Sequence, residues 1–542
     1  MEFESLPSFS SIPPPFPIIG PPFPPPPSAV FHPFHHNPSL FFMMDDQRSM
    51  SLLQFMADEG LVPSPEEEEK RKNVIHKLKQ IISLWIKKVA CQHRLPKHLV
   101  AVTSATILTY GSYGLGVHSS ESDIDALCVA PFFATLAEDF FVVLNDILTR
   151  RTEVSEIHCV KSAKVPLMRF KFDGISIDLP FAQLKVLYVP ENVDVLDPFF
   201  MRNIDDTSWK SLSGVRANKQ ILQLVPNIEN FQAMLRCLKL WAKRRGVYGT
   251  LLGYLGGIHL TILAAYVCQR YPDATLNSLI MNFFRTFAFW PWPTPVMLHE
   301  GMFLRPVDVV ETRFFMPILL PHSPHVCCHS NITKSTFYRI RAELLRGHNM
   351  TRDLSKPDFI WDYVFEAFPY LKRYPEFVKI YLSTPNQNEL GDWVGWVKSR
   401  FRSLLLILEG MQGFCDPNPT EYVDKEKAEP NVVFYWGLLP GKSNSMDKVL
   451  VEGEFMKIIG NGFEGGSPGR MELSIVSASQ LPKNAQTEEG EGASKGRKTC
   501  WKPIDNDEKG NMVCSQPQLL PHCLIGNVPP NGEAAECLSS SG

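Results

Sequence analysis

The chain has 542 residues, of which 44% are apolar and 20% are charged. This composition excludes a wholly disordered protein, because such chains are too poor in apolar residues to bury a core. Lys and Arg number 54 and Asp and Glu number 57, which gives a net charge of −3. A uniformly basic nucleic-acid coat is thereby excluded, whereas a local basic groove is not. At about 150 residues per domain, the length predicts three or four domains.

Cysteine usage and one apolar stretch bear on the compartment. The 12 cysteines include no CxxC pair, which favours buried thiols in a reducing compartment over a disulfide framework or a zinc site. Residues 251–268 carry no Asp, Glu, Lys or Arg, but they include Gly253, Gly256 and Gly257 and barely reach the length that spans a bilayer. We therefore expect a buried helix of a soluble domain there, and no membrane partner.

The first elements in chain order are a tail and a helix. Residues 1–43 are rich in proline, so we expect a disordered tail there, with docking to a proline-binding module as the alternative. Order is expected to begin after Ser64-Pro65, because Ser64 can cap a helix and Pro65 fits its first turn. Apolar residues recur at helical spacing from Val74 to Val89, which predicts a stripe that faces the core.

Strands and helices follow in a mixed order. Asp173-Gly174 is the strongest two-residue hairpin signal in the chain, and Gly246 marks the end of a helical pattern that starts near Phe231. The predicted strands are 105–110, 124–129, 167–172 and 175–181, and the predicted helices include 133–148 and 391–408. This mixture indicates an α+β or α/β domain followed by a mainly helical region. We expect residues 471–542 to be a flexible tail.

Three aspartates form the most informative pattern. Because strand side chains alternate, Asp123 and Asp125 point to one face of their strand while Ile124 points to the other. Asp178 is a lone acid in an otherwise apolar strand, where an unpartnered carboxylate is costly. Three acids aimed at one point repel one another unless a metal neutralises them. The pattern therefore predicts a site for two Mg²⁺ or Mn²⁺ ions and phosphoryl transfer assisted by both.

Gly111-Ser112, at the end of a predicted strand, extends this pattern. Its backbone donors and its hydroxyl suit the oxygens of a phosphate group. Either motif alone is weak, since most Asp-x-Asp pairs are solvated loop acids. In the order Gly-Ser, Asp-x-Asp and then an isolated strand Asp, the motifs predict a nucleotidyltransferase active site.

The residues around these motifs resemble the signature of eukaryotic nuclear-type poly(A) polymerases, which belong to the polymerase-β-like nucleotidyltransferase superfamily. The matching segments are 110–118, 122–131, 172–179, 238–249 and 253–258. The resemblance runs from about residue 45 to residue 440 and is closest to the plant members. It implies an α+β multidomain fold, with a polymerase-β-like catalytic domain over 44–225, a helical middle domain over 226–370 and an RRM-like RNA-binding domain over 371–470.

The resemblance also implies roles for individual residues. Asp123, Asp125 and Asp178 would be the catalytic metal ligands, and Asp178 would also help to deprotonate the RNA 3′-hydroxyl. The residues implied to contact ATP are these three aspartates with Tyr110, Gly111, Ser112, Ser119, Ile124, Lys239, Tyr248, Gly257 and Ile258. Lys164 is a candidate RNA contact.

Some of these residues have a second interpretation. Lys239 lies one helical turn from Lys243, so a solvated basic face is the alternative to a phosphate clamp. For Tyr248, core packing and nucleotide contact are both open. We expect His118 and His259 to be structural, because metal-assisted transfer needs no imidazole. Basic and aromatic residues between 373 and 402 form either a phosphate-binding surface or a solvated charged face.

The predicted function is ATP-dependent, template-independent addition of adenylates to RNA 3′ ends in polyadenylation. The expected partners of this monomer are RNA, ATP and mRNA cleavage and polyadenylation factors. The implied compartment is the nucleus, and the cytoplasm is the alternative because no basic import signal is evident near the C-terminus. The chain departs from the family at Gly114, Ser213, Thr250 and His259. A transferase with another nucleotide preference is therefore one alternative, and a catalytically silent RNA-binding scaffold is another.

Overall fold

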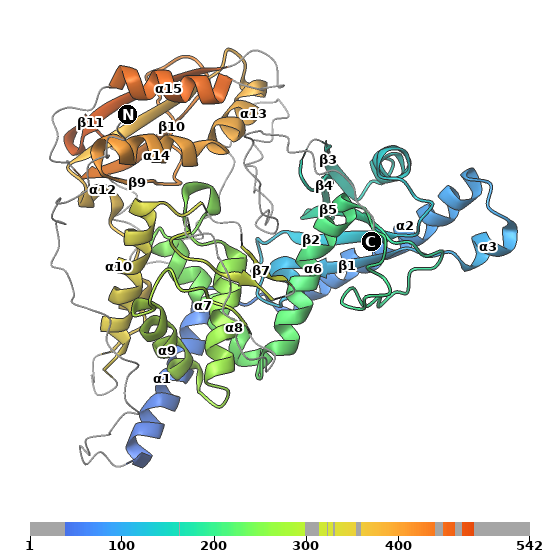
Figure 1. The fold of residues 1–542 in the computed structure, drawn as a ribbon, viewed down its shortest axis with the longest axis horizontal. Coiled ribbons are helices and arrows are strands. Elements are labelled where there is room, and N and C mark those ends of the chain that lie inside the picture. Colours follow the sequence, from blue (N-terminus) through green and yellow to red (C-terminus); the bar gives the residue numbers. More distant parts are fainter. Residues whose placement is uncertain are drawn as a thin grey trace, which may run out of the picture. The chain divides into compact units, whose positions relative to one another are not determined.

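The computed structural model describes residues 38–161, 163–298, 314–321, 323–328, 331–353, 359–439, 448–460 and 469–481. The proline-rich segment 1–37 and residues 482–542 lie outside the described residues, and so do the calls that fall on them. The described part contains both helices and sheets (Figure 1), as the expected α+β class requires.

Helix α1 (Pro38–Asp58) corrects two expectations. Order does not begin after Ser64-Pro65, and the expected tail does not extend to residue 43. Leu52 is fully buried, and the Asp45 carboxylate accepts a 2.6 Å hydrogen bond from the side chain of Asn277. The apolar residues of α1 do not recur at helical spacing, so the helix depends on these tertiary contacts and the pattern could not reveal it.

Helix α2 (Pro65–Gln92) begins where the capping signal predicts. The Glu67 backbone N–H donates to Ser64 Oγ at 3.2 Å, and the Ser64 N–H donates back to the Glu67 carboxylate at 2.9 Å. This reciprocal pair is a capping box. The predicted apolar stripe from Val74 to Val89 is buried, so it faces the core as expected.

A five-stranded sheet with the order β1-β2-β5-β4-β3 carries the aspartates. Its strands are β1 (Thr106–Tyr110), β2 (Ile124–Ala130), β3 (Val154–Val160), β4 (Leu167–Phe172) and β5 (Ile175–Gln183). Strands β2 and β5 run parallel, and the other pairs are antiparallel. Asp173 and Gly174 take positive φ values of 48° and 79° in the turn between β4 and β5, as the predicted hairpin requires. Strand β3 was not predicted, because polar residues interrupt its apolar alternation.

Short helices complete this first region. They are α3 (Lys97–Val102), α4 (Gly111–Gly114), the π-helix η1 (Leu136–Leu144) and α5 (Asn145–Thr149). The helix predicted over 133–148 is thus two consecutive helices that start later. The fully buried side chains of Trp85 on α2, Phe140 on η1 and Phe170 on β4 belong to one core.

A mainly helical region follows. It contains α6 (Asp206–Leu224), α7 (Ile228–Arg244), η2 (Thr250–Leu252), α8 (Gly257–Arg270), α9 (Leu276–Ala288), α10 (Lys334–Thr351), α11 (Asp362–Phe365), α12 (Tyr370–Arg373) and the strand pair β6 (Leu319–Leu320) and β7 (Ser323–Cys327). Gly246, with φ 66°, follows the end of α7 as expected. The apolar stretch 251–268 forms η2 and the buried helix α8. Among the described helices, none has both the length and the apolar content that crossing a membrane requires.

The last region is a four-stranded antiparallel sheet with the order β11-β8-β10-β9. It contains β8 (Glu376–Ser383), α13 (Gln387–Lys398), α14 (Phe401–Gln412), β9 (Phe414–Asp416), β10 (Asn431–Leu439), α15 (Lys448–Gly460), β11 (Arg470–Ser477) and η3 (Ala478–Gln480). With α13 and α14 together in the place of the first helix, the order is the β-α-β-β-α-β of a ferredoxin-like fold, in agreement with the expected RRM-like fold.

Two expectations for this region are wrong. The helix predicted over 391–408 is two helices, since α13 ends at Lys398 and α14 begins at Phe401. The expected tail from residue 471 overlaps β11, which pairs with β8 along its length. Met471 and Leu473 are buried at alternating positions of β11, but Gly and Ser residues around them obscured this short pattern.

Candidate active site

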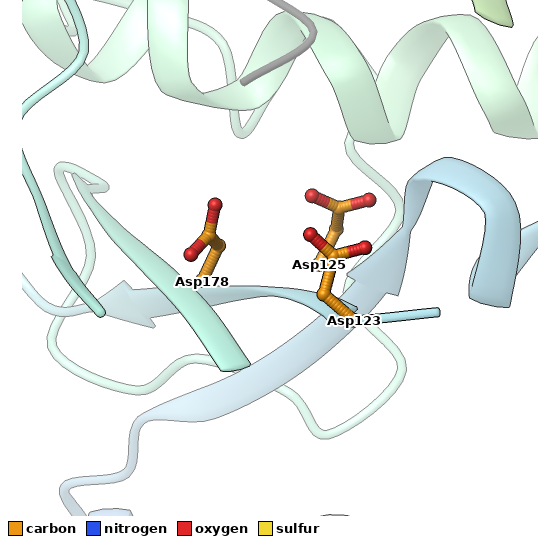
Figure 2. Close-up of side chains that lie close together, drawn as sticks. All are labelled: Asp123, Asp125 and Asp178. Carbon is orange, nitrogen blue, oxygen red and sulfur yellow. The ribbon is translucent and has the colours of Figure 1, made fainter. Parts of the chain in front are cut away.

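The three aspartates meet at the junction of two parallel strands. The register of β2 and β5 places Asp125 directly opposite Asp178, and Asp123 immediately precedes β2. Ligand oxygens of the three carboxylates all lie within 4.8 Å of one another. Figure 2 shows the carboxylates on the same side of the strands that carry them. The spatial arrangement expected from the sequence is therefore present.

Burial and mutual repulsion define the electrostatics of this cluster. Asp125 and Asp178 are buried and Asp123 is half-buried. Burial raises the pKa of Asp125 well above its usual range, and the neighbouring charges of Asp123 and Asp178 raise it further. Burial also raises the pKa of Asp123, with Asp178 as the next cause. A bound divalent cation would relieve both penalties, and carboxylate oxygens are the ligands that Mg²⁺ and Mn²⁺ prefer.

Arg169 is a member of the cluster that the sequence analysis missed. It lies on β4 directly opposite Asp178 on β5, and its side chain forms an ion pair with that carboxylate. The predicted hairpin contained the signal for this pair. Counting back from the two-residue turn at Asp173-Gly174 places Arg169 and Asp178 opposite each other.

Gly111 lies against Asp125 and must be glycine. Its φ is +60°, and a Cβ at this position would lie 1.8 Å from Asp125 Oδ2. The preceding residue, Tyr110, is buried beside the acids. Burial raises the pKa of the Tyr110 hydroxyl, and the charges of Asp125 and Asp178 act in the same direction. Strand β1 thus ends at Tyr110 beside the carboxylates, and the next residue, Gly111, is in contact with Asp125.

Side chains from α6 and α7 hold the segment that follows Gly111. Asn218 Nδ2 donates to the Gly111 carbonyl at 3.0 Å, and Gln232 Nε2 donates to the Leu115 carbonyl at 2.9 Å. Arg236 donates to the next carbonyl, that of Gly116. These bonds fix α4, which carries Ser112, relative to the sheet.

Contacts with α2 hold residues 118–122, which precede Asp123. Arg71 on α2 donates to the Ser120 carbonyl at 2.8 Å, and the Ser119 backbone N–H donates to Ser122 Oγ at 2.9 Å. His118 is buried and forms a 2.9 Å pair with Glu68. This contact anchors the loop to α2, which is a structural arrangement of the kind expected for His118.

Lys239 on α7 is the residue for which the sequence predicts a contact with phosphate. It is half-buried. Burial and the neighbouring charge of Lys243 lower its pKa to about 8, while the charges of Asp123 and Asp125 oppose this shift. Lys239 therefore does not belong to a fully solvated basic face.

The loop before α8 brings together the other predicted ATP contacts. Tyr248 pairs with Leu255 in an isolated parallel bridge, and Gly257 is the first residue of α8. A Cβ on Gly257 would lie 3.6 Å from the Tyr248 hydroxyl. The Gly256 N–H donates to His259 Nδ1 at 3.0 Å, so His259 caps this helix.

Three more of the predicted or divergent residues have clear surroundings. The side chain of Ile124 is fully buried in the core, and Ile258 packs against the helical core. At Gly114, where the family often has Arg, a Cβ would lie 2.8 Å from the Thr109 carbonyl oxygen. The backbone of this chain therefore favours glycine there.

The candidate RNA contacts differ in their burial and in their contacts within the protein. Lys164 is exposed overall, and partial desolvation of its ammonium, followed by the neighbouring charge of Lys210, lowers its pKa. In the last region, Tyr374 is buried and donates to the Asp416 carboxylate. Lys398 is paired with Glu421 at 2.6 Å. Several members of the basic and aromatic set between 373 and 402 are thus already bound within the protein.

Comparisons with known proteins identify the family of the first sheet and of the helical region. The family models "Poly(A) polymerase nucleotidyltransferase domain" and "Poly(A) polymerase central domain" match residues 43–225 and 230–367. Nuclear poly(A) polymerase 3 of Arabidopsis thaliana is 56% identical over 485 residues, which cover 90% of this chain and 95% of that protein. Nuclear poly(A) polymerase 4 of the same plant is 38% identical over 73% of this chain, and the chain spans 55% of that longer relative.

Among solved structures, one of the Cid1 poly(U) polymerase with MgGTP bound aligns with 59% of this chain and 99% of its own length, at 15% identity and a TM-score of 0.43. The family models and the Arabidopsis relatives carry the assignment, since they cover the sheet with the three aspartates and the helical region beside it. The expected resemblance and fold class are confirmed, and the chain belongs to the poly(A) polymerase family.

Proposed function

We propose that this chain is a poly(A) polymerase that transfers AMP from ATP to the 3′ ends of RNA without a template. The observation that carries the proposal is the cluster of Asp123, Asp125 and Asp178, whose ligand oxygens lie within 4.8 Å of one another. Such a cluster of buried acids is costly unless it binds cations. Its presence in a poly(A) polymerase nucleotidyltransferase domain supports an active enzyme over a silent scaffold.

Asp123, Asp125 and Asp178 would hold the divalent ions, which we propose to be two Mg²⁺ or Mn²⁺ ions. Their all-oxygen donor set fits these metals. When bound, such ions favour ionisation of an attacking hydroxyl and offset charge on the leaving pyrophosphate. Asp178 would also accept the proton of the RNA 3′-hydroxyl.

We propose that the ATP site extends from the aspartates to α7 and α8. The Lys239 ammonium, whose charge is favoured by those of Asp123 and Asp125, would offset part of the negative charge of the triphosphate. The N-terminus of α8 at Gly257 presents backbone N–H groups that suit an anion. The other proposed contacts are Tyr110, Gly111, Ser112, Ser119, Ile124, Tyr248 and Ile258.

The chain would divide its work among three domains. We propose a catalytic domain over 44–225, a helical middle domain over 226–370 and an RNA-binding domain from 371, with Lys164 as a further RNA contact. We also propose that the chain is a monomer that works with cleavage and polyadenylation factors. A nuclear location fits the name of the Arabidopsis relative. Imaging of a fluorescent fusion tests the nuclear assignment, and a cytoplasmic signal would reject it.

A primer-extension assay tests the proposed activity. The purified chain, a labelled RNA primer and Mg²⁺ or Mn²⁺ are incubated with ATP, UTP, GTP or CTP separately. We expect ladders of extended primer with ATP. Asp125→Asn should reduce extension by about 10³-fold, because metal stabilisation of the transition state is worth several kcal/mol.

Asp146→Asn is the matched control. Asp146 lies in the same domain, but its side chain is 45% exposed and pairs with Arg150 four residues away. This variant should extend primers at the wild-type rate. Extension by Asp125→Asn at that rate would reject the metal site, preference for UTP would reject the nucleotide, and RNA binding without any incorporation would favour the scaffold.

A further inference from the structure

A two-pronged ion pair lies inside the acid cluster. Arg169 Nε donates to Asp178 Oδ1 at 2.6 Å, and Arg169 Nη2 donates to Asp178 Oδ2 at 2.8 Å. The Asp178 side chain is 4% exposed and that of Arg169 is 23% exposed. Because the planar guanidinium engages both oxygens, it restrains the plane of the carboxylate as well as its position. A lysine ammonium would not reproduce this restraint.

The sheet delivers Arg169 to this position. Arg169 and Asp178 are directly opposite in the antiparallel pair β4–β5, and Asp178 and Asp125 are directly opposite in the parallel pair β5–β2. Residues opposite each other in a sheet present their side chains on the same face. Three adjacent strands therefore carry Arg169, Asp178 and Asp125 in one row across the sheet.

The charges of the cluster favour this arrangement. The hydrogen bonds that Arg169 donates to Asp178 raise the pKa of Arg169, and attraction from Asp123 and Asp125 contributes in the same direction. Lys171, two residues along β4 and on the same face, is engaged elsewhere, with Glu156 at 2.8 Å. Of these two cations, Arg169 is the one bonded to the acid cluster.

We propose that Arg169 is a positioning residue that orients Asp178 for cation binding and for contact with the RNA 3′-hydroxyl. Each Asp178 oxygen accepts one hydrogen bond from Arg169 and keeps a lone pair for a metal ion or a proton. Residues that bond to a metal-binding carboxylate in this way commonly change metal affinity or activity 10–100-fold when removed. The inference rests on the proposed function, since it assigns Asp178 the role given there.

Removal of the Arg169 side chain has two opposing effects on the affinity for a divalent cation. Loss of a positive charge beside the acids would tighten the binding of a divalent cation. Loss of orientation would weaken it, because Asp178 could turn away from Asp123 and Asp125. We expect the orientation effect to dominate, so Mn²⁺ affinity should fall by about tenfold in Arg169→Met.

The experiment measures Mn²⁺ affinity by electron paramagnetic resonance of the free ion, in parallel with primer extension. The variants are Arg169→Met, Arg169→Lys, Asp178→Asn and the double variant Arg169→Met/Asp178→Asn. Arg169→Lys keeps the positive charge but loses the two-pronged ion pair, so it should also bind Mn²⁺ weakly. Its kcat should fall by a larger factor than its KM for ATP rises. In the Asp178→Asn background, Arg169→Met should have no further effect, because its target is absent.

Lys171→Met is the matched control, and it should keep wild-type Mn²⁺ affinity and extension. Tighter or unchanged Mn²⁺ binding by Arg169→Met, full rescue by Arg169→Lys, or a further loss in the double variant would each overturn the positioning role. If Arg169→Met fails to fold by circular dichroism, the comparison of Arg169→Lys with Asp178→Asn decides. A wild-type chain that adds no nucleotide would reject the proposed function, while the Mn²⁺ measurements would still test Arg169.

Discussion

Replacing Gly111 with alanine tests whether the carboxylate cluster must stay in place for catalysis. A Cβ at Gly111 would lie 1.8 Å from Asp125 Oδ2, whereas ordinary contact begins at 3.4 Å. The Asp125 carboxylate must therefore retreat by up to 1.6 Å, the difference between these two distances. A misplacement of about 1 Å in a catalytic group can cost about 10²-fold in rate. We expect kcat for primer extension to fall by at least about 100-fold in Gly111→Ala.

Gly174→Ala separates this effect from backbone strain. Gly174 also has a positive φ, +79°, but a Cβ there has no atom within 4 Å. Both substitutions carry the cost of a left-handed alanine, about 1–2 kcal/mol, which is partly offset by reduced freedom of the unfolded chain. Both should therefore lower the melting temperature by a few degrees.

The assay compares kcat for primer extension with thermal unfolding followed by circular dichroism. Gly111→Ala should lose activity far beyond its loss of stability, whereas Gly174→Ala should keep its activity at temperatures where it is folded. If both variants lose activity equally, strain alone explains the result. If Gly111→Ala keeps the wild-type kcat, then Asp125 tolerates displacement and the assigned geometry is wrong.

Three further predictions follow from charges in the structure. Because the pKa of Lys239 is lowered to about 8, its ammonium is lost as pH rises past that value. The KM for ATP should rise about tenfold between about pH 7.5 and about pH 9, and a pH-independent KM in the wild type, or the same rise in Lys239→Arg, would contradict a phosphate contact. The pKa of Asp125 is raised, so protons compete with cations at this carboxylate, and Mn²⁺ affinity measured by magnetic resonance should fall as pH is lowered from about 8 toward about 5; constant affinity would refute this. Arg245 and Glu343 pair at 2.7 Å with side chains that are each 5% exposed, so Glu343→Ala should cost about 3–5 kcal/mol of unfolding free energy in a denaturant titration. The control, Glu366→Ala, removes an acid that is 60% exposed and should cost less than about 1 kcal/mol, and equal losses would argue against the buried pair.

Strands β1, β2, β4 and β5 and the aspartates were predictable because their information is local. Alternation along 124–129 placed Asp123 and Asp125 on one face, and the turn at Asp173-Gly174 set the hairpin that carries Asp178. The same count from the turn places Arg169 opposite Asp178, so the local pattern also contained this pair.

Other features could not be read from the sequence, because tertiary contacts create them. Helix α1 lacks an amphipathic pattern and is held by contacts such as Asp45 with Asn277. In strand β11, Met471 and Leu473 are buried, and the strand is stabilised by its pairing with β8. The proximity of Lys239 to the aspartates depends on how α7 packs, and no spacing within α7 specifies that.

The parallel pairing of β2 with β5 affects how the protein matures. Asp125 and Asp178 are 53 positions apart in the chain, and η1, α5, β3 and β4 lie between them in sequence, so the pairing of β2 with β5 is a long-range contact. Cation binding by the trio would therefore require β2 and β5 to be paired, and chains in which these strands are apart would lack the site. Divalent ions would therefore stabilise only chains in which the site has formed. In those chains they would raise the resistance to heat and to proteases.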